Sequence, residues 1–356
     1  MVEQRIGEIS VKTLSSPPRT TLLSFRPAVS LMKRRLLRKC LLIVLLTSPF
    51  IGQVEAQYFR QSNYWKTHRR ELSLGFGISN FLGELGGRNQ IGSPFVWDLE
   101  LSQTRPAVHV DYRYYLARKM AIRGRATYGV LAGNDNLTSE VFRQNRNLSF
   151  RSDVYEASLV YEFHMFSEEL GHIYDLRGVQ GTKSSRVGFY AFVGIGGLYF
   201  DPKTQFENKW VRLKPLSTEG QGLPGGPEEY NNFSLCVPMG VGVRRALNKT
   251  LSFGLELQYT KTFTDYIDDV STEYFDPEVL SATHGDVAAY LSDPSLGVGP
   301  LYQHGLNPTA VGQQRGDPED LDAYLFLKFQ LHYKIVKYKS GSKKYRTRIR
   351  RQKIVF

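Results

Sequence analysis

The stretch "LSFGLELQYTKTFTDYIDDVSTEYF", residues 251–275, decides the fold. Its first half alternates apolar and polar residues with the period of a β-strand. The apolar positions are Leu251, Phe253, Leu255, Leu257 and Tyr259. Its second half passes without a turn signal into three carboxylates, Asp265, Asp268 and Asp269, and several aromatic residues. We therefore expect a strand that faces lipid and leaves the membrane near Asp265, with these acids solvated in a loop beyond it.

Seven further stretches repeat this alternation of an apolar face with a polar, often charged face. With residues 250–263 they make eight strands of about ten or more residues, at 70–79, 106–116, 120–131, 154–166, 186–200, 233–247 and 323–335. In the fifth, Phe189, Val193 and Ile195 are expected on the apolar face. Glycine (32 residues) and aromatic residues (13%) are frequent, as is usual for β structure.

A soluble sandwich and a membrane barrel both fit alternating strands, and three features favour the barrel. The strands are long enough to cross a bilayer when tilted. Aromatic residues collect at strand ends, as an interfacial girdle requires, at Tyr114, Tyr115, Tyr199, Phe200 and Tyr333. The polar faces carry Glu, Arg and His that can pair inside a narrow cylinder. We predict an all-β fold, an eight-stranded antiparallel transmembrane β-barrel over residues 70–335, in the cell outer membrane.

The connections alternate in length, which predicts the orientation of the barrel. Long loops are expected at 80–104, 132–147, 201–229 and 266–321, tight turns at "LARK" (116–119) and "LNK" (247–249), and a medium turn at 167–185. Long loops of such barrels are extracellular and short turns are periplasmic. Residues 57–69 are then an N-terminal periplasmic segment. Eight strands leave an interior filled by side chains, so a general diffusion pore is not expected.

The N-terminal region carries a predicted export signal. Residues 32–56 combine a basic start, an apolar run over 41–51 and small residues before a cleavage point after Ala56. The apolar run is too short for a membrane anchor, and Cys40 precedes it, which argues against lipidation. Residues 1–31 are interpreted as an upstream extension from a misplaced start, or else as a long basic region of the signal. Only Cys236 follows the cleavage point, so no intrachain disulfide is expected in the mature chain.

Charge is concentrated at the C-terminal end. Residues 334–356 hold ten Lys/Arg and no acid, whereas residues 57–333 carry a net charge of −4. We expect residues 336–356 to form a basic periplasmic tail that binds anionic lipid or an acidic partner. Its candidate partner-binding residues are Lys343, Lys344, Arg346, Arg348, Arg350 and Arg351. Nucleic-acid binding fits the charge of the tail but is not expected for an exported chain. The other alternative is a disordered tail that binds no partner.

No catalytic set, cofactor motif or metal-ligand cluster stands out, and no enzyme activity, cofactor or small-molecule substrate is expected. His109, His164 and His332 fall on predicted lumen faces, where they would join a packed polar network. The glycine-rich stretches 75–87 and 194–197 lack the following helix of a nucleotide-binding loop. There are two alternatives to this expectation. Asp265, Asp268 and Asp269 could bind calcium, or the barrel could be a hydrolase.

Several segments resemble one family of barrels. "GFGISNFLGELGG", "RNLSFRSDVYEASLVYEFHMF", "YAFVGIGGLYFDPK", "WVRLKPLSTEGQGLPGGP", "VPMGVGVRRAL" and "LELQYTKTFTDYIDDVSTEYFD" are similar to PorG, the small outer-membrane barrel of the Bacteroidota type IX secretion system. The resemblance covers about residues 70–335. The "PLSTEGQGLPG" and "TFTDYIDDVST" segments are the most distinctive. The long basic tail, the extension over 1–31 and an expanded 276–314 loop depart from the family pattern.

The resemblance implies a non-enzymatic role in protein secretion, in which the barrel tethers a periplasmic ring, built of a lipoprotein and its partner, to the outer membrane. On that reading the basic tail and the 167–185 turn are the docking elements. The alternative is a stand-alone barrel, similar to OmpA and OmpX, that stiffens the envelope or displays adhesive loops.

Overall fold

The structure is a computed structural model, and it describes residues 64–85, 101–137, 141–168, 172–173, 182–183, 186–248, 250–297, 302 and 305–336. The predicted extension, the signal peptide and the basic tail with its six candidate residues lie outside this range. No helix within it is both long and apolar enough to cross a bilayer.

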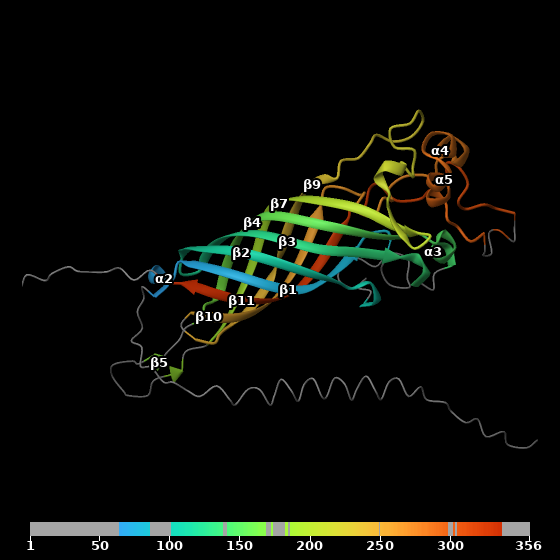
Figure 1. Cartoon of the computed structure of the whole chain (residues 1–356). Helices are drawn as coiled ribbons and strands as arrows, with labels where there is room; N and C mark the ends of the chain where they lie inside the picture. Colours follow the sequence, from blue (N-terminus) through green and yellow to red (C-terminus); the bar gives the residue numbers. More distant parts are fainter. Residues whose placement is uncertain are drawn as a thin grey trace, which may run out of the picture. The chain divides into compact units, whose positions relative to one another are not determined.

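Eight long antiparallel strands close into a barrel (Figure 1). They are β1 (Arg70–Leu82), β2 (Arg105–Ala117), β3 (Met120–Asn134), β4 (Ser149–Phe166), β7 (Val187–Phe206), β9 (Phe233–Ala246), β10 (Leu251–Thr262) and β11 (Ala323–Ile335). Neighbours pair in the order β4-β3-β2-β1-β11-β10-β9-β7, and β4 pairs with β7 to close the ring. Every backbone edge of the cylinder is thereby satisfied, which lipid requires. The predicted strand number and fold are confirmed.

Apolar residues face outward and charged residues face inward. On β1, Leu74 and Phe76 are 64% and 67% exposed, whereas Glu71 and Ser73 are buried. Lys328 on β11 is likewise buried. A water-soluble sandwich would show the reverse, because exposed apolar surface in water is unfavourable. This barrel is built for a bilayer, and barrels of this kind are outer-membrane proteins.

β4 and β7 are longer than the sequence indicated, and β7 continues into a hairpin at the end of the barrel that carries the long connections. The strand predicted over 154–166 begins at Ser149, and the one predicted to end at 200 continues to Phe206 and turns back as β8 (Lys209–Arg212). The predicted loop over 201–229 therefore begins as a strand. In these extensions the side chains on the outer face are Arg151 and Asp153 of β4 and Lys203 of β7. The apolar alternation therefore stops, although β4 and β7 continue to pair.

The long connections gather at one end of the barrel, where Figure 1 shows α3 (Val141–Arg146), α4 (Pro277–His284) and α5 (Asp286–Ser292). Short 3₁₀ turns lie at Leu101–Gln103, Asp135–Leu137 and Lys214–Leu216. The other end carries α2 (Tyr64–Thr67) and, within the predicted medium turn, the pair β5 (His172–Ile173) and β6 (Thr182–Lys183). We call the first end the outer cap and the second the inner rim.

The predicted aromatic girdle is only partly confirmed. Tyr199 and Tyr333 are exposed on the outer wall, but Phe200 is fully buried. Tyr115 also points inward, where its hydroxyl accepts a hydrogen bond from Arg244 at 2.8 Å. Adjacent residues of a strand point to opposite faces. A pair of neighbouring aromatic residues therefore cannot both join the girdle.

Candidate functional site

The lumen near the inner rim is filled by ion pairs and hydrogen bonds, which join both adjacent strands and strands that are not neighbours. Arg113 on β2 contacts Glu71 and, at 2.6 Å, Glu162 on β4. Arg244 on β9 reaches Glu71 at 2.9 Å. His332 accepts or donates a 2.7 Å hydrogen bond with Ser73. These side chains are buried, so the charges are paired in a region that excludes bulk water.

A second layer of ion pairs crosses the middle of the lumen. Arg123 and Arg125 on β3 contact Glu256 on β10 at 2.7 and 2.5 Å, and Arg125 also contacts Asp111 at 2.9 Å. In the ring order β3 and β10 are four strands apart, on opposite walls of an eight-stranded cylinder. Lys328 donates to Gln258 at 2.6 Å within the same layer. Side chains thus bridge the full width of the lumen, as an eight-stranded barrel requires.

The three lumen histidines are buried as predicted, but their surroundings differ. His332 bonds Ser73, and His164 lies 3.3 Å from Glu162. His109 makes no side-chain hydrogen bond within the described residues. Its ring packs on Gly75 instead, where an added Cβ would lie 2.1 Å from His109 Cε1. The network prediction holds by a hydrogen bond for His332 and by proximity to Glu162 for His164, and Gly75 makes room for His109.

An apolar layer separates the polar lumen from the outer cap. It is a continuous cluster of buried side chains that includes Phe81, Phe150, Phe200, Phe326 and Leu198. Phe81 and Phe150 pack edge to face with centroids 4.8 Å apart. The cluster continues into the cap through Ile267, Val270 and Leu291. The cap is therefore packed onto the barrel.

The expectation that the acids after β10 are solvated is wrong. Asp265, Asp268 and Asp269 are 5%, 1% and 0% exposed. Asp269 accepts hydrogen bonds of 2.6 Å from both Thr218 and Tyr230. Asp268 accepts from the backbone N–H groups of Leu85 and Val270, each at 3.2 Å. The carboxylates tie the loops to each other instead of meeting water.

A cation pairs with only part of this acidic region. Arg315 donates to Glu219 at 2.8 Å and to the carbonyl of Asp269 at 2.6 Å. Glu219 also accepts from the backbone N–H of Ser271 at 2.9 Å. Asp265, by contrast, has neither carboxylate oxygen hydrogen-bonded within the described residues. Charge is thus compensated at Asp269 and left uncompensated at Asp265.

Burial raises the pKa of several cap carboxyls. Burial, with Asp268 close by, raises the pKa of Asp265 to about 9. Burial likewise raises the pKa of Glu84 to about 7, and that of Asp269 to about 6 against the opposing effect of Arg315. The pKa values of Asp268 and Asp322 lie well above their usual range, because both are buried beside other acids. A buried carboxyl without a counter-charge favours its neutral form.

The calcium alternative is not supported by the arrangement of these acids. Asp268 and Asp269 bind different partners, and among the residues that the structure describes no three His, Cys, Asp or Glu side chains are placed to hold a metal ion. The carboxylates of Asp268 and Asp269 instead stabilise the cap by accepting hydrogen bonds from its loops.

The inner rim is where the predicted docking elements would begin. Glu168, the described end of the 167–185 turn that follows β4, contacts Arg244 at 2.8 Å and also Lys334 of β11. Its carboxylate accepts a hydrogen bond from Ser252 at 2.9 Å. This closes the lumen at the rim and anchors the last described strand, after which the basic tail would follow.

The comparisons with known proteins find similar barrels among solved structures. No protein-family model matches the chain, and no curated protein matches it. Neisserial surface protein A is similar at 8% identity and a TM-score of 0.32, over 75% of this chain and 97% of that one. The attachment invasion locus protein Ail of Yersinia pestis, solved with the heparin analogue sucrose octasulfate, is 7% identical with a TM-score of 0.32. The match covers 75% of this chain and 98% of Ail. The outer membrane protein OprG of Pseudomonas aeruginosa is 10% identical with a TM-score of 0.31. The match covers 76% of this chain and 99% of OprG.

Proposed function

We propose that this chain is a non-enzymatic, structural outer-membrane barrel that acts through its two ends. The observation that carries the proposal is the lumen, which two layers of buried ion pairs and one apolar layer fill from wall to wall. Transport of a solute would require breaking these contacts, and separating buried ion pairs is costly. The inner rim and the outer cap are then the surfaces available to bind partners.

The more specific form of the proposal is a role in type IX secretion, in which the barrel tethers a periplasmic ring of a lipoprotein and its partner. It is supported by the family resemblance of segments such as "PLSTEGQGLPG" and "TFTDYIDDVST" and by the basic composition of residues 336–356. The first lies in the cap after β8, and the second contains the acids that tie the cap loops together.

Deletion of residues 337–356 tests this form. The full chain and the deletion variant are expressed in the native host, extracted in mild detergent and compared for recovery of the periplasmic ring proteins. We expect the deletion to lose the ring while the barrel stays folded, as judged by its gel mobility before and after heating. Recovery of the ring at the level of the full chain would exclude the tail as the tether.

A charge variant separates electrostatic docking from chain length. Neutralising Lys343, Lys344, Arg346, Arg348, Arg350 and Arg351 to Gln should reduce ring recovery, whereas exchanging Lys for Arg and Arg for Lys at the same positions should retain it.

The alternative function is a stand-alone barrel that stiffens the envelope or presents an adhesive cap. The packed cap favours it, because a rigid outer surface suits recognition at the cell exterior. Absence of ring proteins from every native extract, together with loss of surface adhesion on replacement of the cap loops, would favour this alternative.

A further inference from the structure

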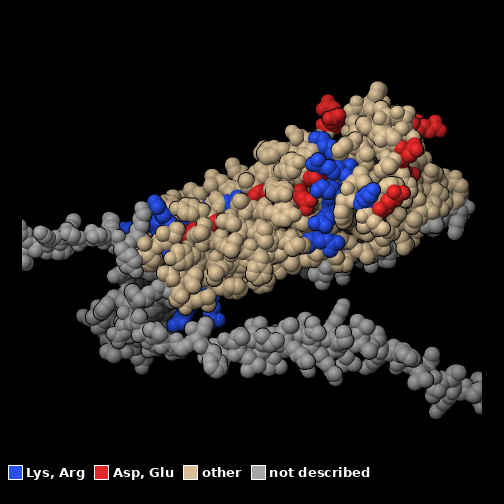
Figure 2. Space-filling model, in the orientation of Figure 1, with Lys and Arg blue, Asp and Glu red and all other residues tan. Residues whose placement is uncertain are grey.

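The outer ends of β4 and β7 and the adjoining barrel-side end of β8 carry three cations in one row on the outward face. Arg151 pairs in register with Lys203, and Lys203 pairs with Arg212. The side chains of Arg151 and Arg212 are 42% and 57% exposed. We call Arg151, Lys203 and Arg212 the outer cation row. Figure 2 shows a band of Lys and Arg across the molecule where the barrel wall meets the cap.

Carboxylates on the membrane side and an aromatic ring on the outer side hold this row in place. Lys203 Nζ lies 2.8 Å from Asp153 and 3.1 Å from Asp201, and Arg212 Nε lies 2.8 Å from Asp201. The guanidinium of Arg151 lies 5.3 Å from the ring centroid of Trp210. The cations are therefore positioned by protein contacts, and the side chains of Arg151 and Arg212 stay partly exposed.

A row of tyrosines marks the depth of the membrane interface just below the cations. Tyr128, Tyr155 and Tyr199 pair directly across β3, β4 and β7, with ring centroids 5.0 and 6.2 Å apart. Exposed tyrosines of barrels sit at the headgroup boundary. The cation row follows four residues further out, about 13 Å along the strand. That distance puts the cations among lipid headgroups.

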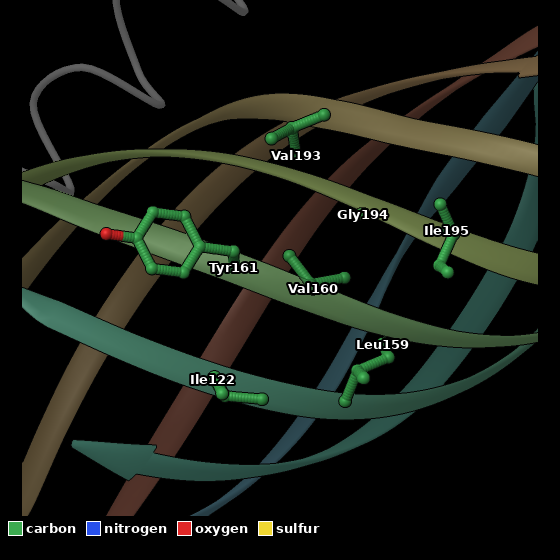
Figure 3. A pocket seen from close by; sticks show the side chains of 7 residues that line it. All are labelled: Ile122, Leu159, Val160, Tyr161, Val193, Gly194 and Ile195. Carbon is green, nitrogen blue, oxygen red and sulfur yellow. The ribbon is translucent and has the colours of Figure 1, made fainter. Parts of the chain in front are cut away.

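The same strands carry an apolar hollow at the depth of the acyl chains. Figure 3 shows it on the wall across β3, β4 and β7, lined by Ile122, Leu159, Val160, Tyr161, Val193, Gly194 and Ile195. Leu159 pairs with Ile195 four residues inward from the Tyr155–Tyr199 pair. A cation row, an aromatic row and an apolar hollow thus follow one another along one strip of wall.

From this order we propose that the strip binds a phosphate-bearing lipid of the outer leaflet, with its phosphate groups on Arg151, Lys203 and Arg212 and an acyl chain over the Leu159–Ile195 hollow. Guanidinium and ammonium donors match phosphate oxygens in charge and hydrogen bonding. Asp153 and Asp201 hold Lys203 and Arg212 in place. The inference does not depend on a secretion partner, because it concerns the outer end of the barrel, whereas β11 ends at the inner rim.

The test uses the purified full chain in a neutral detergent, with diphosphorylated lipid A as the probe and bound lipid counted by native mass spectrometry. The variant Arg151→Gln/Lys203→Gln/Arg212→Gln should bind this probe at least tenfold more weakly, because each cation near a phosphate surface is worth about a fivefold change in affinity. Enzymatically dephosphorylated lipid A should bind the unaltered chain as weakly as it binds the variant.

The matched control is Lys119→Gln/Arg186→Gln/Arg245→Gln, three exposed cations at the inner rim whose loss changes the net charge equally. It should bind diphosphorylated lipid A within about twofold of the unaltered chain. Equal losses in both triple variants, no loss in the outer variant, or equal binding of dephosphorylated lipid would each overturn the proposal. So would full displacement of the lipid by an equal concentration of inorganic phosphate. Retained heat-dependent gel mobility verifies that both variants are folded.

Discussion

At the scale of single residues, the barrel depends on buried charges that compensate one another across the lumen. Arg113 connects β2 with Glu71 of β1 and Glu162 of β4, and all three side chains are buried. Each carboxylate also contacts a second cation, Arg244 for Glu71 and Arg123 for Glu162, so the charges form a network. The interior cations are therefore structural.

Replacing Arg113 with Met should destabilise the folded barrel by about 1–3 kcal/mol, because carboxylate oxygens of Glu71 and Glu162 lose a buried hydrogen-bond donor while Arg244 and Arg123 still compensate their charges. Urea unfolding of the refolded barrel in lipid vesicles measures this change. The double variant Arg113→Met/Glu162→Gln should recover part of the loss, which a double-mutant cycle would report as coupling. Lys119→Met, at an exposed turn, should have little effect; a loss equal to that of Arg113→Met would contradict the interpretation.

At the scale of elements, the loop from β10 to β11 is an ordered part of the cap. Asp322 accepts a hydrogen bond from the backbone N–H of Ile267 at 2.9 Å, which joins the two ends of the loop. Tyr230 stacks on Tyr266 with centroids 4.5 Å apart and rings 7° from parallel. Buried acids and stacked aromatic rings together give the cap a defined structure.

The cap should become less stable as the pH rises from about 5 to about 9. Its buried acids, Glu84, Asp265, Asp268 and Asp322, have pKa values raised by burial, whereas unfolded carboxyls titrate near pH 4. The folded cap therefore holds more protons than the unfolded cap between these values. Its stability is fully present at low pH and declines through about pH 7 for Glu84 and about pH 9 for Asp265. The facing cations, Arg146 and Arg315, lessen the effect without cancelling it.

Proteinase K digestion of the folded barrel across this pH range measures cap opening, with a denatured substrate correcting for the pH dependence of the protease. Asp265→Asn should flatten the pH dependence and slow cleavage at pH 9. Asp320→Asn, an exposed acid of the same loop, should leave the dependence intact. Greater resistance of the unaltered cap at pH 9 than at pH 5 would refute the assignment.

At the scale of the whole molecule, the apolar outer wall makes the barrel a membrane protein. Phe76, Leu255 and Phe329 lie on this wall on neighbouring strands, with the rings of Phe76 and Phe329 5.7 Å apart. In a bilayer these side chains meet acyl chains. In water the same wall would be a large apolar patch of the kind that drives aggregation.

Phe76→Arg should lower the stability of the vesicle-inserted barrel by about 2–4 kcal/mol, the cost of a lipid-facing cation deep in the bilayer. Val311→Arg is the control, because Val311 is similarly exposed (59%, against 67% for Phe76) but lies in the cap loop. Urea unfolding in vesicles compares the two. Equal, small effects would show that the wall does not face lipid.

The sequence alone determined the strand number, the direction of each face and the placement of long connections at one end, because a strand in lipid must alternate apolar and polar residues throughout its length. Only the tertiary structure decided which charges pair, that the acids around Asp268 are buried, and that β4 and β7 continue beyond the membrane. Those features depend on contacts between residues distant in sequence. Outside lipid no alternating pattern is required, so the strand ends at Ser149 and Phe206 left no periodic signal.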